Sequence, residues 1–168
     1  DLNEKVGQNW RMLLHIGLTM LLNLQNRSRA YNIGKRHYDI GNDVYEAMLD
    51  KRMAYSCAYW QDADNLDAAQ EAKLDLVCRK LGLKSGQRVL DVGCGWGSFA
   101  GFAAERYGVE VFGVTVSKEQ GKWMEERYAG LPVQALVKDC RELEGEFDHA
   151  VSIGMFEHVG RKNYREFM

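Results

Sequence analysis

One glycine-rich run, at residues 89–97, constrains the fold of this chain more than any other feature. The run reads Val-Leu-Asp-Val-Gly-Cys-Gly-Trp-Gly, so a short apolar segment leads directly into three alternating glycines. Glycine lets a backbone turn tightly and approach a ligand closely, because it has no Cβ. In parallel α/β sheets, ligands bind beside the loops that follow the carboxyl ends of the strands. The run therefore predicts a strand, a ligand-binding loop and a helix, in that order.

Segments with strand and helix character alternate on both sides of this loop. We predict strands at 88–92, 109–115, 133–137 and 147–153, and helices at 65–81, 96–107 and 117–128. Strands that alternate with helices are typical of a parallel α/β sheet with right-handed crossovers. The chain begins at Asp1, and residues 163–168 read as a helix that has just begun. We therefore expect a fragment of a longer polypeptide, cut after the fourth strand of its sheet.

The residues around the loop select among possible ligands. A nicotinamide fingerprint reads G-x-G-x-x-G, with an acid about 20 residues further on. Here Ser98 stands at the third glycine position and the second strand ends at Thr115, which disfavours a pyrophosphate ligand. Asp91, before the glycines, suits a ligand with a cationic amino-acid end, and S-adenosylmethionine is such a ligand. Asp139, after the third strand, is placed to accept a hydrogen bond from an adenine amino group.

Gln120 has two interpretations. It lies three residues after Ser117, which is the capping-box pattern of a helix start. It also follows the second strand closely enough to contact the ribose of a nucleoside ligand. The sequence leaves both interpretations open.

Composition excludes several other classes of function. The formal net charge is −2, so the chain has no overall basic field to hold nucleic acid. The cysteines at 57, 78, 94 and 140 share no metal-ligand spacing, and we expect no metal site. No signal peptide opens the sequence, which favours reduced thiols in the cytoplasm.

The first half of the chain is less regular. The apolar run at 10–24 is interrupted by polar residues and falls short of the roughly 20 residues that a membrane span needs. We expect a helix that packs on protein or lies on a membrane surface. Residues 26–59 are irregular and rich in aromatic side chains, as in a lid or binding segment. We therefore divide the chain into a helical segment at 1–25, a lid and helical part at 26–82, and a ligand-binding α/β core at 83–168.

Four further stretches narrow the identification. The glycine loop resembles the motif of class I S-adenosylmethionine-dependent methyltransferases, with a Rossmann-like sheet covered by helices on both faces. The wider set resembles the family of cyclopropane-fatty-acid synthases and mycolic acid cyclopropane synthases. Its stretches read His-Tyr-Asp-Ile-Gly-Asn-Asp at 37–43, Tyr-Ser-Cys-Ala-Tyr-Trp at 55–60, Gly-Val-Thr-Val-Ser-Lys-Glu-Gln at 113–120, and Gly-Met-Phe-Glu-His-Val-Gly at 154–160.

The resemblance implies a reaction, cofactors and partners. Members transfer a methylene unit from S-adenosylmethionine to a cis double bond of a phospholipid acyl chain, with a bound bicarbonate ion as the base. Two alternatives remain, namely a methyltransferase that adds a methyl branch to a lipid, and a non-catalytic cofactor-binding fragment. The resemblance also implies a cytoplasmic protein associated peripherally with the membrane, and we expect a homodimer.

By the same resemblance, individual residues receive roles. The catalytic group is Glu157, which helps to hold the bicarbonate, Cys57, whose neighbouring backbone groups contribute to that site, and Gly154, which allows close backbone approach. The cofactor-binding group comprises Tyr55, Ser56, Asp91, Gly93, Gly95, Gly97, Thr115, Gln120 and Asp139. A carbocation formed from the alkene is stabilised by aromatic faces and by exclusion of water. Aromatic side chains available for such a wall are Tyr55, Tyr59, Trp60 and Phe156.

Overall fold

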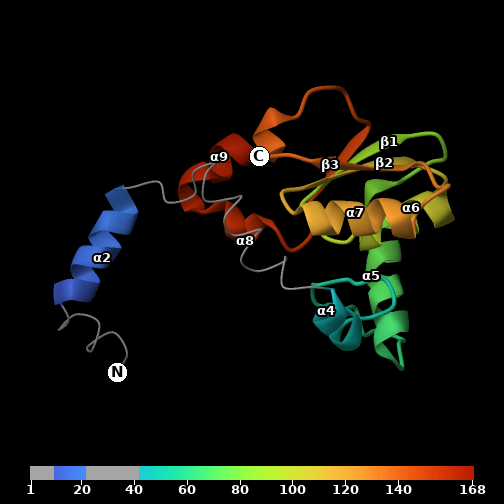
Figure 1. Ribbon diagram of the computed structural model, residues 1–168, viewed down its shortest axis with the longest axis horizontal. Coiled ribbons are helices and arrows are strands. Elements are labelled where there is room, and N and C mark those ends of the chain that lie inside the picture. The colour runs from blue at the N-terminus through green and yellow to red at the C-terminus, as the bar shows by residue number, and fades with distance from the viewer. Residues whose placement is uncertain (1–9, 22–41) are drawn as a thin grey trace.

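The computed structural model describes residues 10–21 and 42–168 (Figure 1). Its helices are α2 (Trp10–Leu21), α4 (Asp43–Met48), α5 (Leu66–Leu81), α6 (Ser98–Tyr107), α7 (Lys118–Arg127), α8 (Phe156–Val159) and α9 (Tyr164–Phe167). Its strands are β1 (Arg88–Val92), β2 (Glu110–Thr115), β3 (Val133–Val137) and β4 (His149–Val151), and its short 3-10 turns are η1 (Cys140–Glu142) and η2 (Arg161–Asn163). The motif residues 37–41 lie outside the described part.

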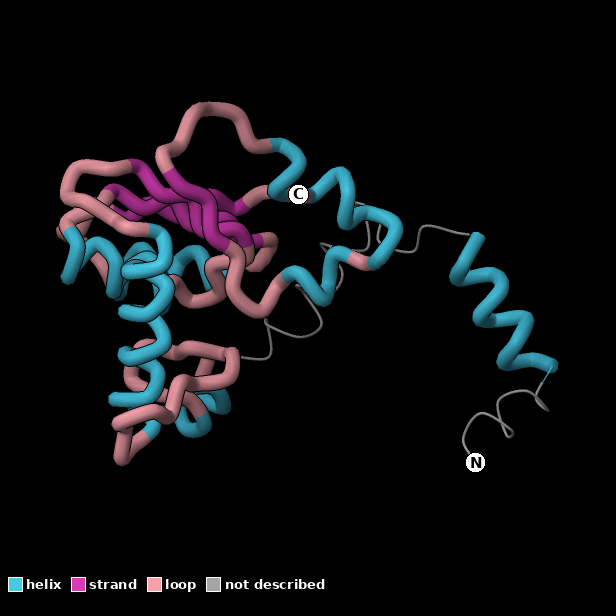
Figure 2. The backbone as a smooth tube through the Cα atoms, turned by 180° about the vertical axis from the view of Figure 1, so that it is seen from behind, coloured by secondary structure: helices cyan, strands magenta, loops and turns pink. Residues whose placement is uncertain are grey.

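The four strands form one parallel sheet in the order β3-β2-β1-β4. Leu90 of β1 pairs with Phe112 of β2 on one side and with Ala150 of β4 on the other. The views from front and back place α5, α6 and α7 on the same side of this sheet (Figures 1 and 2). The predicted α/β class is confirmed, and the described residues show the layer of helices on this one face.

Local signals in the sequence explain both ends of α5 and the start of α7. The Asn65 side chain accepts a hydrogen bond from the Ala68 N–H at the start of α5, and Gly82 ends that helix with φ of 64°. The Ser117 side chain likewise accepts from the N–H of Gln120 at the start of α7. Such caps satisfy backbone groups that a helix end leaves without partners. The predicted helix at 65–81 is confirmed.

Several predicted elements are one or two residues shorter at an end in the structure, and the largest differences are at α6 and β4. The helix expected from residue 96 begins at Ser98, because Gly97 has φ of 78° and ends the loop instead of starting the helix. The strand expected at 147–153 is paired only over His149–Val151.

The hydrophobic core lies between the sheet and the helices α5, α6 and α7. Its fully buried side chains include Leu74, Cys78, Val89, Phe99, Val111 and Met124. Gly101 of α6 faces Tyr128 so closely that a Cβ at this position would overlap the tyrosine ring. The tight packing holds α6 and α7 against β2 and β3, and it thereby positions the loop between β1 and α6.

Candidate functional site

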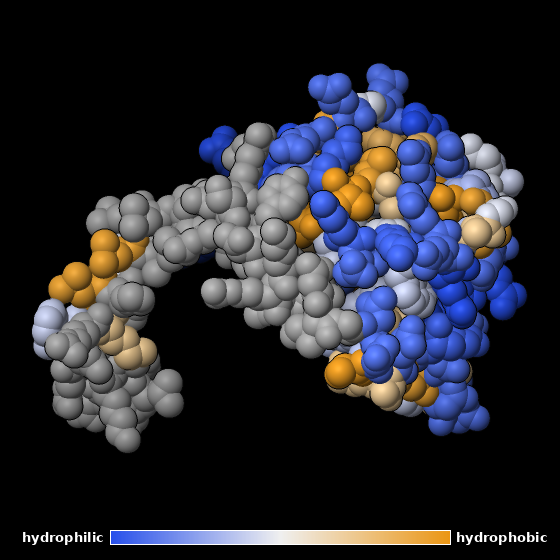
Figure 3. Space-filling view, viewed as in Figure 1, coloured by the Kyte–Doolittle hydropathy of each residue, from blue (hydrophilic) through white to orange (hydrophobic). Residues whose placement is uncertain are grey.

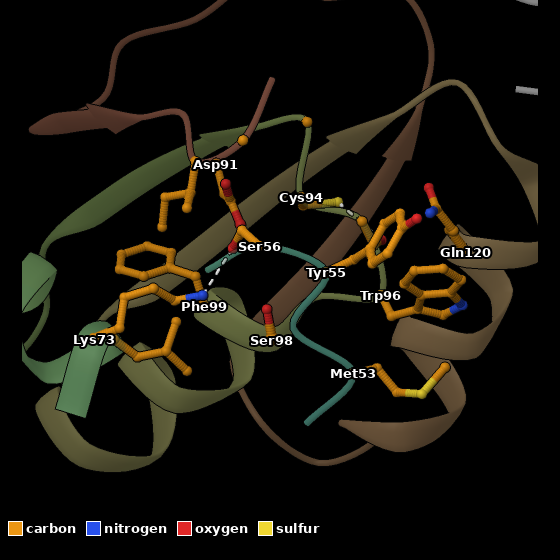
Figure 4. A pocket seen from close by; sticks show the side chains of 15 residues that line it. Met53, Tyr55, Ser56, Lys73, Asp91, Cys94, Trp96, Ser98, Phe99 and Gln120 are labelled. Atoms are coloured by element: carbon orange, nitrogen blue, oxygen red, sulfur yellow. Dashed lines mark hydrogen bonds between the residues drawn. The ribbon is translucent and has the colours of Figure 1, made fainter. Parts of the chain in front are cut away.

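A cleft of about 80 Å³ opens where the glycine loop meets residues 53–56 and the segment after β4 (Figure 4). It lies at the carboxyl end of β1, which is where open α/β sheets bind their ligands. Its lining comprises Met53, Tyr55, Ser56, Lys73, Leu74, Asp91, Gly93, Cys94, Gly95, Trp96, Ser98, Phe99, Gln120, Ile153 and Gly154.

The glycine loop leaves its backbone open to this cleft. Gly93 and Cys94 both donate their N–H groups to the carbonyl oxygen of Val114, at 2.9 and 3.0 Å, which ties the loop to β2. Gly95 has φ of 57°, and a Cβ placed there would meet no atom within 4 Å. A Cβ on Gly93 would instead overlap Met155. The loop is therefore held by its flanks, while Gly95 leaves room for a ligand against the main chain.

Asp91 places a buried carboxyl group at the floor of the cleft. Its side chain is 2% exposed, and among the described residues it has no hydrogen-bond or ion-pair partner. Burial raises the pKa of Asp91 from 3.8 to about 7, because the charged form is poorly solvated there. A cationic group that entered the cleft would favour the ionised carboxylate and lower that pKa again.

Residues 53–56 form a wall of the cleft, and they belong to a non-helical segment that α5 holds in place. The Asp50 carboxylate accepts the N–H groups of Arg52 and Ala54, at 3.0 and 2.7 Å, and this folds the segment into a turn. Gln70 of α5 donates its side-chain amide to the carbonyl oxygens of Ala54 and Ser56, at 3.2 and 2.9 Å. The predicted cofactor residues at 55 and 56 consequently line the cleft.

A lysine on α5 reaches the same wall. The Nζ of Lys73 donates a hydrogen bond of 2.7 Å to the Oγ of Ser56, as the dashed line in Figure 4 shows. Partial burial lowers the pKa of Lys73, although the carboxylate of Asp50 opposes that effect. Lys73 and Gln70 are three positions apart, so they lie on one face of α5. The side of α5 that faces the cleft is therefore polar at its centre.

Gln120 forms another wall through a contact with β2. The Oγ1 of Thr115 donates to the side-chain oxygen of Gln120 at 2.9 Å, and it accepts the Ser117 N–H at 3.2 Å. Gln120 thus contributes its backbone N–H to the Ser117 cap, while its side chain bonds Thr115 in place of the second half of a capping box. With its oxygen engaged, the amide nitrogen of Gln120 is left as the donor beside the cleft.

Aromatic rings cover one end of the cleft. The ring of Trp96 lies 4.6 Å from that of Tyr45 and 6.5 Å from that of Tyr55, measured between centroids. The indole nitrogen of Trp96 donates to the side chain of Asn42 at 2.9 Å. Trp96 is 1% exposed and Tyr55 is 58% exposed, so the buried ring supports the exposed one.

The structure brings seven of the predicted site residues together and leaves five outside the lining. Together in the cleft are Tyr55, Ser56, Asp91, Gly93, Gly95, Gln120 and Gly154, whereas Cys57, Gly97, Thr115, Asp139 and Glu157 do not line it. Thr115 acts on the cleft through Gln120, and Gly97 faces Met124 of α7. The Asp139 carboxylate is engaged by the Arg141 guanidinium at 2.8 and 2.5 Å.

The remaining predicted residues lie on exposed surface. Cys57 is exposed, and so is Glu157 on α8. Among the aromatic side chains expected to form a wall, Tyr59 and Trp60 are exposed and do not line the cleft. Phe156 stacks on Tyr164 with 4.3 Å between ring centroids.

Sequence reasoning missed eight residues of the lining, namely Met53, Lys73, Leu74, Cys94, Trp96, Ser98, Phe99 and Ile153. A signal for Lys73 was present, because Gln70 and Lys73 interrupt the apolar side of a helix whose Leu74 and Cys78 are buried. A polar side chain on a buried helix face needs a partner, and such positions are candidates for a site.

Comparisons with known proteins agree in sequence and in structure. The family model described as mycolic acid cyclopropane synthetase matches residues 25–168. The cyclopropane-fatty-acyl-phospholipid synthase of Escherichia coli strain K12 is 53% identical over 163 residues, covering 97% of this chain and 43% of the relative. The cyclopropane mycolic acid synthase 1 of Mycobacterium tuberculosis strain H37Rv is 40% identical over 136 residues, covering 78% of this chain and 47% of the relative.

A solved structure gives the same result. The structure of the mycolic acid cyclopropane synthase CmaA1 complexed with SAH and CTAB matches with a TM-score of 0.77 and 39% identity. The match covers 82% of this chain and 50% of that one. This chain thus spans about half the length of the relatives that it matches.

Proposed function

The chain belongs to the mycolic acid cyclopropane synthetase family, and on that premise we propose that its cleft binds S-adenosylmethionine for the cyclopropanation of unsaturated phospholipid acyl chains. The observation that carries the proposal is the buried Asp91 carboxyl without a partner among the described residues, beside the open backbone of Gly95. A carboxyl in that position suits the ammonium group of an amino-acid ligand. The matching structure of CmaA1 is a complex with SAH, and this supports the same ligand class.

The residues present fit this cofactor along its length. Asp91 and the glycine loop form one end of the cleft, and the amide nitrogen of Gln120 is a donor at another wall. Tyr55 and Ser56 close the side that α5 supports. We propose that Gly93, Gly97 and Thr115 act indirectly by shaping the loop and the β2 end. We propose Asp139 for the adenine amino group, which requires its contact with Arg141 to rearrange.

When bound, the cofactor supplies an electrophilic methyl group on a sulfonium. Attack of the acyl double bond on that carbon would leave a carbocation on the lipid and release the cofactor as a neutral thioether. Ring closure would then transfer one proton of the methyl group to a bound base. The protein contributes by orienting the reactants, by excluding water and by presenting aromatic faces to the cation. Tyr55, held against Trp96 and Tyr45, is the described ring best placed for that role.

A bicarbonate ion is the second expected ligand, and here the fit is incomplete. Gly154 lines the cleft with φ of 68°, and a Cβ there would lie 3.4 Å from the Cβ of Ser56. Glu157 and Cys57 are exposed and do not line the cleft. The ion is therefore proposed on the family resemblance alone, and no chemical step is assigned to it.

We propose further that the protein works at the surface of a phospholipid membrane on its cytoplasmic side, as a homodimer. Exposed apolar side chains on α2 support a surface contact; they include Trp10, Leu13 and Leu14. Figure 3 shows orange hydrophobic surface over the described part of this helix. Within the described ranges, no helix combines the length and the apolar character needed to cross a membrane.

The experiment that tests the activity uses the whole protein with S-adenosylmethionine and vesicles of a cis-unsaturated phospholipid. The acyl chains are analysed by mass spectrometry and by proton NMR. We expect a gain of one CH2 with the upfield signals of a cyclopropane ring. Vesicles with saturated chains serve as the control and should stay unchanged.

Each other outcome has a defined meaning. A gain of one CH2 as a methyl or methylene branch would show that the protein adds a branch to the acyl chain and does not form a cyclopropane ring. Unchanged lipid with S-adenosylmethionine still bound would contradict the lipid substrate and leave a cofactor-binding protein.

A further inference from the structure

The cleft contains one buried acid and one partly buried base that do not neutralise each other. Asp91 has no ion-pair partner among the described residues, and Lys73 contacts the hydroxyl of Ser56 instead of a carboxylate. Both line the same cleft, and Figure 4 shows them on different elements, with the hydrogen bond from Lys73 to Ser56 drawn as a dashed line. Burying a charge is unfavourable unless a partner offsets it. Two opposite charges kept apart in one cleft are complementary to a ligand that carries both.

We propose that Lys73 and the hydroxyl of Ser56 bind the carboxylate of the ligand's amino-acid end, while Asp91 receives its ammonium group. The inference rests on the proposed S-adenosylmethionine site and assigns it a residue that neither the sequence motifs nor the comparisons indicate. Lys73 lies on α5, outside the glycine loop and outside every stretch that carries the family resemblance.

The hydrogen-bonding capacity of the pair supports this assignment. An ammonium group has three donors, and the Nζ of Lys73 uses one of them on Ser56. Because the Oγ of Ser56 is the acceptor in that bond, its own proton is free to be donated elsewhere. The pair therefore offers the cleft at least two donors, one of them cationic. A carboxylate accepts several hydrogen bonds, and those from charged donors are the stronger ones.

Lys73 has no ion-pair partner among the described residues, although the neighbouring carboxylate of Asp50 opposes the lowering of its pKa by burial. That carboxylate accepts the backbone N–H groups of Arg52 and Ala54. The amide of Gln70, one turn away on α5, is occupied by two backbone carbonyls. Those contacts hold the segment at 54–56 in place without Lys73, so the ammonium group of Lys73 is not needed for that purpose.

A purely structural role is the competing explanation, and it makes a different prediction. If Lys73 only tied Ser56 to α5, its removal would weaken every ligand of the cleft alike. If it binds the carboxylate, its removal weakens ligands that have that group and spares those that lack it. The test therefore compares two ligands as well as two proteins.

The experiment titrates the whole protein by calorimetry with S-adenosylhomocysteine and with its decarboxylated analogue, which keeps the amine. The variants are Lys73→Met, Lys73→Arg and, as matched control on the exposed end of α5, Lys80→Met. We expect Lys73→Met to bind S-adenosylhomocysteine about 10–100-fold more weakly and the analogue unchanged. Lys73→Arg should recover most of the affinity, and Lys80→Met should match the wild type.

The wild type alone provides a second measurement that does not depend on the folding of any variant. It should prefer S-adenosylhomocysteine to the decarboxylated analogue by at least about 10-fold. Equal affinity for the two ligands, or an equal loss for both in Lys73→Met, would overturn the role of Lys73 and leave the cofactor site intact. Failure of the wild type to bind either ligand would overturn the proposed function, and this inference with it.

Discussion

Replacing Asp91 by asparagine should have opposite effects on stability and on binding. The pKa of this carboxyl is raised from 3.8 to about 7 in the folded chain by burial. Between those values the folded chain holds a proton that the unfolded chain has released. Stability contributed by this group therefore falls as the pH rises from about 4 to about 7, and it stays at the lower level above that range.

The size of the effect follows from the displacement of the pKa. A difference of one unit between the folded and unfolded pKa corresponds to about 1.4 kcal/mol. The ionised carboxyl therefore lowers the free energy of unfolding by up to about 4 kcal/mol at pH 8. Asparagine has nearly the same shape and cannot ionise. We expect Asp91→Asn to equal the wild type in stability near pH 4 and to exceed it by about 2–4 kcal/mol at pH 8. Its affinity for S-adenosylhomocysteine should fall about 10–100-fold, because the ammonium loses a charged partner.

Urea titrations followed by the fluorescence of the four tryptophans measure the stability difference at a series of pH values. Asp62→Asn, at an exposed position, is the matched control and should show no pH-dependent difference. A difference between Asp91→Asn and the wild type that does not change with pH would refute the reasoning. So would an asparagine variant that is less stable than the wild type at pH 8.

Three further substitutions test other parts of the structure. Gly101→Ala should lower the free energy of unfolding by about 1–3 kcal/mol in urea titrations, because the new methyl overlaps the ring of Tyr128; unchanged stability would mean that the ring moves freely. Thr115→Val should lower the free energy of unfolding by about 1–2 kcal/mol, because the side chain of Gln120 loses its hydrogen-bond donor. It should also weaken the binding of S-adenosylhomocysteine measurably in calorimetry; full affinity would show that Gln120 does not contribute to the site. Glu157→Gln should lower turnover on lipid vesicles by about 10–1000-fold with cofactor affinity nearly unchanged, because the family resemblance places Glu157 beside the bicarbonate; a collapse of binding would instead assign Glu157 to the cofactor.

The sequence predicts β1 and β3 to the residue, because each is a short apolar run with turn residues at its ends. The start of α6 is less predictable. The pattern of apolar residues continues through Trp96, but three alternating glycines with positive φ delay the helix to Ser98. Backbone conformation at glycine depends on what packs nearby, and periodicity carries no information about it.

The residues of the cleft also differ in how well the sequence predicts them. Asp91, Gly93 and Gly95 are predictable because the chain brings them to the cleft in one continuous loop. Lys73 enters from a helix that precedes the sheet, and its contact with Ser56 spans 17 positions. Such a contact depends on how α5 packs on the rest of the fold. A single sequence shows the polar interruption in the helix but not what it meets.

The strand order has a consequence for how the cleft assembles. The strands β1, β2 and β3 join through consecutive crossovers, whereas β4 returns to the far side of β1 after β3 is complete. The hydroxyl of Ser152, just after β4, donates to the carbonyl oxygen of Val92 across 60 positions of chain, at 2.9 Å. Contacts between distant segments carry the larger loop-closure entropy, and on this ground we expect them to form later in folding. We expect the glycine loop to form early in folding and the side of the cleft around Gly154 to form last. The cleft would then be completed only in the final step of folding.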